Sequence, residues 1–475
     1  MKFKVTISRR KFIHKTAAAL SFVYLPGIGR VQAQPYPESI GGDYQGRLCY
    51  NENPLGPSPK ALAAIQDAVS LSHRYPDWYS SNLENKIAQF HGLSPSQICV
   101  GAGATEVLRL IADAVLAPGD EMITATPTYF QMAAETTANG ATVVHVPVDE
   151  NYVIDLPSIL QAVSLKTKLI SLVNPNNPLG TIVNKTDMEN LIHSVPKGIV
   201  VVVDEAYHEY VHNLNYESCM RFAKEGLPII VVRTFSKVYG LAGTRIGYAV
   251  ASPQHTGLIA SSQMFGTVSR HAQAAAEAAL EDQDHINHTI TLNDHAKQYL
   301  EKGLSDRGID VIKSETNFMM FDTGTEAIAV AAKLASNGYQ VRTGWGMPQH
   351  IRVSTGTMEE MEGFLKALDN ILTSGISENI SYPKTFALNS VYPNPFNFQC
   401  KIKISTFGTE KVQLTIYDTF GRKVRSLINN NLPPGVNHIL WDGKNASGQR
   451  VASGIYMINL IQGEFATSAK VTLVK

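Results

Sequence analysis

The sequence is poor in cysteine and has no excess of charge of either sign. Its 475 residues include four cysteines, and lysine plus arginine total 41, as do aspartate plus glutamate. The cysteines lie far apart without a C-x-x-C pair, which argues against a structural zinc site and a disulfide-dense scaffold; whether any of them pair stays open. A net charge of zero leaves no electrostatic footprint for nucleic acid, so we expect no nucleic-acid partner.

No long hydrophobic run opens the chain, although its first residues follow an export pattern. A basic start with Arg9 and Arg10 in "SRRKF" precedes a modest apolar run over 16–29 and a small-residue cleavage pattern that ends at Ala33. This order predicts a signal peptide over residues 1–33, and "SRRKF" resembles a twin-arginine signal, which exports folded proteins. We therefore expect a protein of the periplasm, the cell surface or the medium, with export machinery as a partner. Retention of the segment as an uncleaved anchor stays open.

Strand-like runs alternate with helical ones in the first half of the chain. Several are apolar on consecutive residues, which is typical of strands buried on both faces of a parallel sheet. The pattern predicts an α/β domain with a largely parallel sheet, whose functional residues lie beyond the carboxyl ends of the strands. The runs span residues 97–103, 121–129, 141–148, 168–175, 198–207, 228–237 and 245–250.

The pattern changes after residue 267. An alanine-rich helical stretch over 270–304 leads to short strand patterns and a last helix, which predicts a smaller α+β part over about 267–373 that also takes in the N-terminal arm. The large part is expected at about 76–266. Polar residues predict a linker over 374–387, and six strand-like runs with turn signals between them predict an all-β sandwich over 388–475.

Polar residues with chemical potential follow several of the predicted strands. The glycine-rich turn "GAGATE" opens a helix whose first amides, those of Ala104 and Thr105, could hold a phosphate. Asp204 ends the apolar run "VVVVD", where a carboxylate needs a cationic or hydrogen-bonding partner. Lys237 ends another strand, in "RTFSKVYGLAGTRIGYAV". Each feature alone has a commonplace explanation as a turn, a helix cap or a surface lysine, but their joint occurrence indicates one site.

In this order the motifs resemble the fold-type I pyridoxal-phosphate (PLP) aminotransferases of class I/II, and among them the histidinol-phosphate aminotransferase branch. The resemblance covers about residues 48–372. It is carried by "NENPLGP", "RYPD", "GAGATE", "PTY", "NPNNPLG", "VVDEAY", "TFSKVYGLAGTRIGY", "ETNF" and "IRVSTGT". It implies a PLP-transferase fold with a mostly parallel seven-stranded sheet, PLP as the cofactor, no metal, and a homodimer with shared active sites.

The resemblance also implies roles for individual residues. Lys237 would bond covalently to the cofactor aldehyde and afterwards move a proton, and Asp204 would face the pyridine nitrogen. Arg245 would pair with the cofactor phosphate, and Gly240 and Gly243 would let the chain curl around that ligand. The remaining cofactor-binding residues would be Ala104, Thr105, Thr234 and Ser236 at the phosphate, Asn177 and Tyr207 at the ring hydroxyl, Tyr129 on the ring face, and Tyr75 reaching the phosphate across the dimer interface.

For the substrate, the resemblance implies that Arg352 binds a carboxylate or phosphate, with Arg342 and Asn53 as further pocket residues. Thr105 stands where the family usually has an acid, Gly266–Thr267 departs from the usual pair, and the loop between the two arginines is short. We expect the last two departures to border the substrate pocket. They leave the substrate open.

We therefore expect a PLP-dependent transaminase that moves an amino group between an amino donor and a 2-oxo acid or related carbonyl acceptor. Histidinol phosphate is the nearest family substrate, but export argues against it because histidine biosynthesis is cytosolic. A decarboxylase or lyase on the same scaffold, and a non-catalytic surface binding protein, stay open as alternatives.

"HEYVH" (208–212) formally matches the H-E-x-x-H zinc motif, but it follows a strand end directly and no third ligand motif comes after it, which disfavours a zinc hydrolase.

After residue 388, "YPNPFN", "LTIYDTFGRKVRSL" and "WDGKNASGQRVASGIYMINL" resemble the secretion-sorting or FlgD-type Ig-like tails of surface proteins. This resemblance implies a sorting or attachment module, with a generic adhesive sandwich as the alternative.

Overall fold

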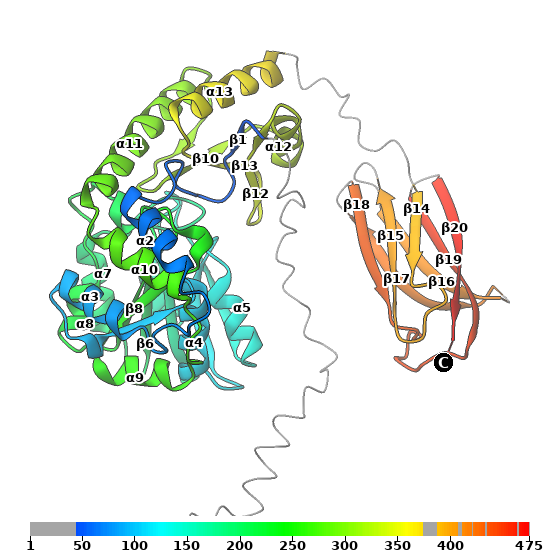
Figure 1. Cartoon of the computed structure of the whole chain (residues 1–475). Helices are drawn as coiled ribbons and strands as arrows, with labels where there is room; N and C mark the ends of the chain where they lie inside the picture. The colour runs from blue at the N-terminus through cyan, green and yellow to red at the C-terminus, as the bar shows by residue number, and fades with distance from the viewer. Residues whose placement is uncertain are drawn as a thin grey trace, which may run out of the picture. The chain divides into compact units, whose positions relative to one another are not determined.

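The computed structural model describes residues 44–373, 387–406, 411–419, 421–432, 435–462 and 465–474. The chain divides after Thr373 into two compact units, each with its own hydrophobic core (Figure 1). The predicted signal peptide and nearly all of the predicted linker lie outside the described residues. Within the part that is described, no helix is both long enough and apolar enough to cross a membrane.

A seven-stranded sheet forms the centre of the first unit, in the order β2-β8-β7-β6-β5-β3-β4. Five neighbouring strands, from β7 to β4, run parallel, whereas β8 is antiparallel to both β7 and β2. Each predicted run supplies one strand, so the mostly parallel sheet is confirmed. The strands are β2 (Ile98–Gly101), β3 (Glu121–Thr126), β4 (Thr142–Pro147), β5 (Thr167–Val173), β6 (Val200–Asp204), β7 (Ile229–Thr234) and β8 (Gly247–Ala251).

Helices cover both faces of this sheet, which explains the uninterrupted apolar runs. In β6, Val201 and Val203 join one core, whereas Val202 joins the core on the opposite face. On the first face lie α2 (Pro59–Val69), α3 (Ser81–His91), α6 (Leu156–Gln161), α7 (Lys185–Ser194), α8 (Met220–Lys224) and α10 (Arg270–Leu280). On the second face lie α4 (Ala104–Val115), α5 (Gln131–Ala138) and α9 (Pro253–Ser261).

A second core forms the smaller part of this unit. It lies between a four-stranded antiparallel sheet, in the order β12-β13-β10-β9, and helices α11 (Gln283–Ser305), α12 (Ala327–Ser336) and α13 (Met358–Thr373). The sheet strands are β9 (Val311–Ile312), β10 (Phe318–Asp322), β12 (Arg342–Gly344) and β13 (Met347–Ser354). The N-terminal arm joins this part, because β1 (Gly46–Arg47) pairs in parallel with β11 (Tyr339–Gln340).

The alanine-rich stretch was expected to belong to the small part, and this is wrong for its first third. The chain breaks between Leu280 and Gln283 into α10 and α11, and the alanines of α10 pack in the core of the large part beside α2 and α3 (Figure 1). Alanine side chains allow the close approach of two helices but do not specify which helix approaches. Only α11 continues into the small core, through Ala296, Leu300 and Leu304.

The second unit is a sandwich of two antiparallel sheets, β14-β15-β18 and β17-β16-β19-β20, around a core centred on the fully buried Trp441. Six of its strands match the predicted runs. The seventh, β14, was missed, and its first residue was assigned to the linker, because a bulge and polar residues break the alternation of "ALNSVY". The strands are β14 (Ala387–Tyr392), β15 (Cys400–Thr406), β16 (Lys411–Asp418), β17 (Lys423–Asn431), β18 (Gly435–Trp441), β19 (Gly454–Gln462) and β20 (Phe465–Leu473).

Candidate active site

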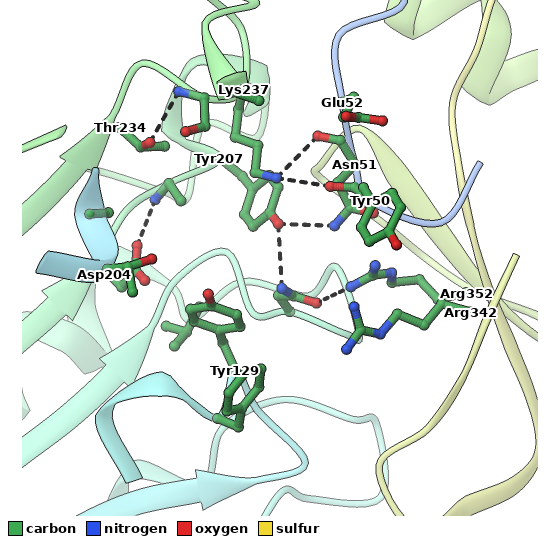
Figure 2. A pocket seen from close by; sticks show the side chains of 18 of the residues that line it. Tyr50, Asn51, Glu52, Tyr129, Asp204, Tyr207, Thr234, Lys237, Arg342 and Arg352 are labelled. Atoms are coloured by element: carbon green, nitrogen blue, oxygen red, sulfur yellow. Dashed lines mark hydrogen bonds between the residues drawn. The ribbon is translucent and has the colours of Figure 1, made fainter. Parts of the chain in front are cut away.

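A cavity of about 1090 Å³ lies at the carboxyl ends of the central strands. Its walls come from the large part, from the N-terminal arm and from strands β12 and β13 of the small part (Figure 2). Twelve of the predicted site residues line it together: Ala104, Thr105, Tyr129, Asn177, Asp204, Tyr207, Thr234, Ser236, Lys237, Arg245, Arg342 and Arg352.

The side chain of Lys237 projects into the cavity from the segment that follows β7. Its Nζ donates hydrogen bonds to two backbone carbonyls of the N-terminal arm, those of Tyr50 and Asn51, each at 3.1 Å (Figure 2). Burial lowers the pKa of Lys237 to about 7, and the positive charge of Arg352 acts in the same direction. Near neutral pH the amine is therefore available both as a nucleophile and as a carrier of one proton.

Asp204 and Tyr207 lie on the floor of the same cavity, at and after the end of β6. The Asp204 carboxylate accepts a hydrogen bond from the Ala206 amide at 3.1 Å, and burial raises the pKa of Asp204 to about 6. The Tyr207 hydroxyl accepts hydrogen bonds from Asn51 Nδ2 at 2.9 Å and Asn177 Nδ2 at 3.4 Å. Burial raises the pKa of Tyr207 to about 12, so Asp204 is charged and Tyr207 neutral at neutral pH.

The opposite end of the cavity is built to receive an anion. The amides of Ala104 and Thr105, in the first turn of α4, have no carbonyl acceptor within the helix, and the guanidinium of Arg245 lies beside Gly103, just before them. A Cβ atom at Gly103 would approach Arg245 Nη2 to 2.5 Å, and one at Gly247 would approach the Ala104 amide nitrogen to 2.4 Å. Gly247 is required because the atom its Cβ would meet is backbone, and Gly103 is favoured because its φ of +83° lies in the left-handed region.

Arg352 is a buried cation whose visible partners are neutral. Its Nη1 donates to Asn177 Oδ1 at 2.5 Å, its Nη2 donates to the carbonyl of Cys49 at 2.7 Å, and its Nε has no partner among the described residues. Burial lowers the pKa of Arg352 to about 10, which still leaves the guanidinium charged at neutral pH. A buried charge with neutral partners is costly, so the geometry favours an anionic ligand at this position.

Three predicted features lie outside the cavity. Asn53 is a buried residue of the arm, and its Nδ2 donates to the Val238 carbonyl and to Thr289 Oγ1, so it positions the arm and does not line the pocket. Tyr75 lies on the exposed surface of this chain. Gly266 does not border the cavity as expected, since its amide donates to the Trp78 carbonyl at 2.8 Å, near that surface.

Several residues that line the cavity were not predicted from the sequence. Arg47, Tyr50, Asn51 and Glu52 come from the arm, and Phe130 and Trp345 from loops of the large and small parts. The motif "NENPLGP" was a usable signal for Asn51 and Glu52. The contribution of Tyr50 had no signal, because its backbone carbonyl contacts Lys237 and any residue type can supply a carbonyl.

The histidines of "HEYVH" contact separate partners. The segment contains a single 3-10 turn, His208–Tyr210, and not the helix that H-E-x-x-H requires. His208 Nδ1 bonds to the Tyr216 hydroxyl at 3.1 Å, whereas His212 Nε2 pairs with Asp294 at 2.8 Å. Within the described residues, no group of three histidine, cysteine or acidic side chains is arranged to hold a metal ion. All four cysteines are buried and unpaired.

Comparison with known proteins agrees with this geometry. Residues 45–368 match the family described as Aminotransferase class I and II, and residues 400–462 match the FlgD Ig-like domain. Histidinol-phosphate aminotransferase of Caldicellulosiruptor saccharolyticus is 38% identical over 353 residues, which is 74% of this chain and 97% of that protein. Histidinol-phosphate aminotransferase 2 of Hydrogenovibrio crunogenus is 38% identical over 357 residues, 74% of this chain and 94% of that protein.

A solved structure shows the same likeness in three dimensions. Histidinol-phosphate aminotransferase from Sinorhizobium meliloti, in complex with pyridoxal-5'-phosphate, superposes with a TM-score of 0.67 at 30% identity, over 70% of this chain and 92% of that one. The family match covers more than half of the chain and contains every residue that lines the cavity. The chain therefore belongs to the class I and II aminotransferases and carries an FlgD Ig-like domain after its catalytic unit.

Proposed function

We propose that the protein is a PLP-dependent transaminase that moves an amino group between a small anionic amino donor and an anionic carbonyl acceptor. One observation carries the proposal: a single cavity combines the half-buried amine of Lys237, the buried carboxylate of Asp204 and the anion cradle at Arg245. These three groups suit the aldehyde, the ring nitrogen and the phosphate of PLP.

The cradle fits the cofactor phosphate. Arg245 Nη1 donates to the Ala242 carbonyl at 2.9 Å and to Ser236 Oγ at 3.5 Å, both of them neutral acceptors. A phosphate dianion beside the α4 terminus would receive charge-assisted hydrogen bonds from this guanidinium and from the amides of Ala104 and Thr105. The hydroxyls of Thr234 and Ser236 line the same wall.

When bound, PLP supplies an electron-withdrawing ring that stabilises negative charge on the substrate carbon. Asp204, charged at neutral pH, would hold the proton of the ring nitrogen, and Asn177 and Tyr207 would bind the ring hydroxyl. Lys237 would attach the cofactor and, once free, carry one proton between two carbon atoms. The carbonyls of Tyr50 and Asn51 hold its amine in place while it is free.

The substrate is proposed on chemical grounds. Arg352 is the receptor for a carboxylate or phosphate, and Arg342 brings a second cation to the same wall. The relatives' names favour histidinol phosphate as the donor, whereas an exported location would favour another anionic amine. Donor-dependent spectra of the purified holoenzyme separate these cases, and release of carbon dioxide or of an eliminated group would establish the decarboxylase or lyase alternative instead.

We propose that the enzyme is a homodimer. Two neighbouring segments of the catalytic unit expose apolar side chains, Tyr75, Trp78 and Tyr79 on one and Met264 and Phe265 on the other, and they meet where the Trp78 and Phe265 rings lie 5.1 Å apart. Burying this apolar surface against a second copy of the chain is favourable. Such an interface would let Tyr75 of the second copy reach the cofactor phosphate. Phe265→Asp is expected to yield monomers, which analytical ultracentrifugation detects, and to weaken PLP binding, which an absorbance titration measures. An unchanged dimer would contradict this placement of the interface.

We also propose that the protein is exported and that its FlgD Ig-like domain serves in sorting or attachment. The support is the "SRRKF" pattern at one end and a separately folded sandwich at the other. A chain ending at residue 380 is expected to keep its turnover and change its location in cell fractionation, since each unit has its own core. Loss of turnover in a folded truncated chain would mean that the sandwich contributes to the active site.

Lys237→Ala is expected to abolish turnover while PLP binding persists more weakly, since the phosphate cradle remains intact. Absorbance spectra with and without an amino donor measure both effects. Lys297→Ala is the matched control: Lys297 is also a half-buried lysine whose pKa is lowered by desolvation, but it does not line the cavity. Near-normal turnover of Lys237→Ala would overturn the role of this lysine.

The attachment of PLP to the cofactor-free protein should depend on pH through Lys237. Only the neutral amine attacks an aldehyde, and burial lowers the pKa of Lys237 from 10.5 to about 7. The attachment rate is therefore expected to rise through about pH 7 and to level off above it. Stopped-flow absorbance measures the rate. A rate that keeps rising toward pH 10.5 would show an ordinary, solvated lysine.

A further inference from the structure

The tight turn between β12 and β13 contains a residue that the turn itself does not favour. Gly344 pairs with Met347, and the two residues between them, Trp345 and Gly346, both have positive φ, 59° and 74°. A two-residue hairpin turn of this kind favours Asn-Gly, because asparagine and glycine tolerate the left-handed region. A bulky tryptophan is strained there, so the geometry of the turn does not account for a tryptophan at this position.

The indole of Trp345 occupies a defined place in the active-site wall. It packs against the small apolar cluster of Leu179, Ile312 and Met320, which anchors the ring from the protein side. It also lines the cavity beside the two arginines of the substrate wall. The Cζ atom of Arg352 lies 5.0 Å from the centre of the indole, and that of Arg342 lies 5.5 Å from it.

Both guanidiniums are within the range at which an aromatic ring attracts a cation. The attraction matters here because the two side chains carry like charges, and the charge of Arg342 is one of the causes that lower the pKa of Arg352, after burial. Figure 2 shows the two side chains next to each other at one end of the cavity. An anchored ring within reach of both guanidiniums offsets their repulsion and limits the directions in which they can turn.

We propose that Trp345 is a specificity-determining residue, which holds Arg342 beside Arg352 so that the pocket selects substrates with a second anionic group, on the side chain. The inference rests on the proposed transaminase function. Arg352 would take one anionic group of the substrate and Arg342 the other. Carboxylate and phosphate share this chemistry, and the donors tested below distinguish them.

The test compares Trp345→Asn and Trp345→Phe in the holoenzyme. Asparagine suits the turn, so Trp345→Asn is expected to fold with an unchanged or higher melting temperature, and phenylalanine keeps an aromatic face. The donors are L-glutamate, with a side-chain carboxylate, O-phospho-L-homoserine, with a side-chain phosphate, and L-norvaline, with an uncharged side chain. Single-turnover absorbance gives the rate and the half-saturating concentration for each donor.

Trp345→Asn is expected to lower the preference for an anionic over an uncharged side chain about tenfold, through the half-saturating concentration more than the single-turnover rate, while Trp345→Phe keeps most of it. A change with glutamate alone identifies the carboxylate as the selected side-chain group, and a change with O-phospho-L-homoserine alone identifies the phosphate. A preference that is equal in the wild type and Trp345→Asn overturns the proposal, as does an equal loss with all three donors.

A binding measurement separates this proposal from the proposed function. Titration calorimetry of the holoenzyme with glutarate and with butyrate, which are unreactive, compares a dianion with a monoanion. Trp345→Asn is expected to weaken glutarate binding much more than butyrate binding. This result with no turnover of any donor would leave the selectivity standing and sink the transaminase function. Equal weakening of the binding of both acids, with turnover intact, would overturn the selectivity and leave the transaminase function supported.

Discussion

The partial burial of the Lys237 amine, which lowers its pKa, is the constraint on which the rest of the site depends. A lysine removed from water needs partners for its ammonium protons, and two carbonyls of the N-terminal arm supply them. The arm must therefore be held in place. Asn51 does this from a left-handed backbone conformation, with hydrogen bonds between its side chain and both Tyr207 and Ser354, while Asn317 donates to its carbonyl.

A buried ionic network supports the strand ends from behind. Arg233 precedes Thr234 in β7, and its guanidinium pairs with Glu205, at 2.8 Å, and with Glu209, at 3.2 Å. Glu205 in turn follows Asp204, so the network ties the end of β7 to the end of β6. A buried ion pair adds little net stability after its desolvation is counted, but it restricts geometry. Here that restriction keeps the carboxylate, the phosphate cradle and the lysine at constant separations.

Much of the fold was predictable because local signals agree with the tertiary structure. The runs of β5, β6 and β7 are apolar on consecutive residues, and helices do cover both faces of their sheet. Failures occurred where a local pattern has more than one tertiary solution. The alanines of α10 suit any close helix neighbour, and polar residues with a bulge hide β14. Asn53 carried the expected side chain in the expected motif, yet its amide turns toward Val238 and away from the cavity.

The sequence by itself determined which chemical groups reach the site from the large part. Lys237, Asp204 and Asn177 follow neighbouring parallel strands, and the carboxyl ends of parallel strands meet at one edge of a sheet. Only the tertiary structure decided what closes the site. The carbonyl of Asn51, 186 residues before Lys237, and the ring of Trp345 reach the cavity by packing of the arm and the small part. A backbone carbonyl has no residue-type signature, and a single tryptophan has no period, so neither could be read before the chain was folded.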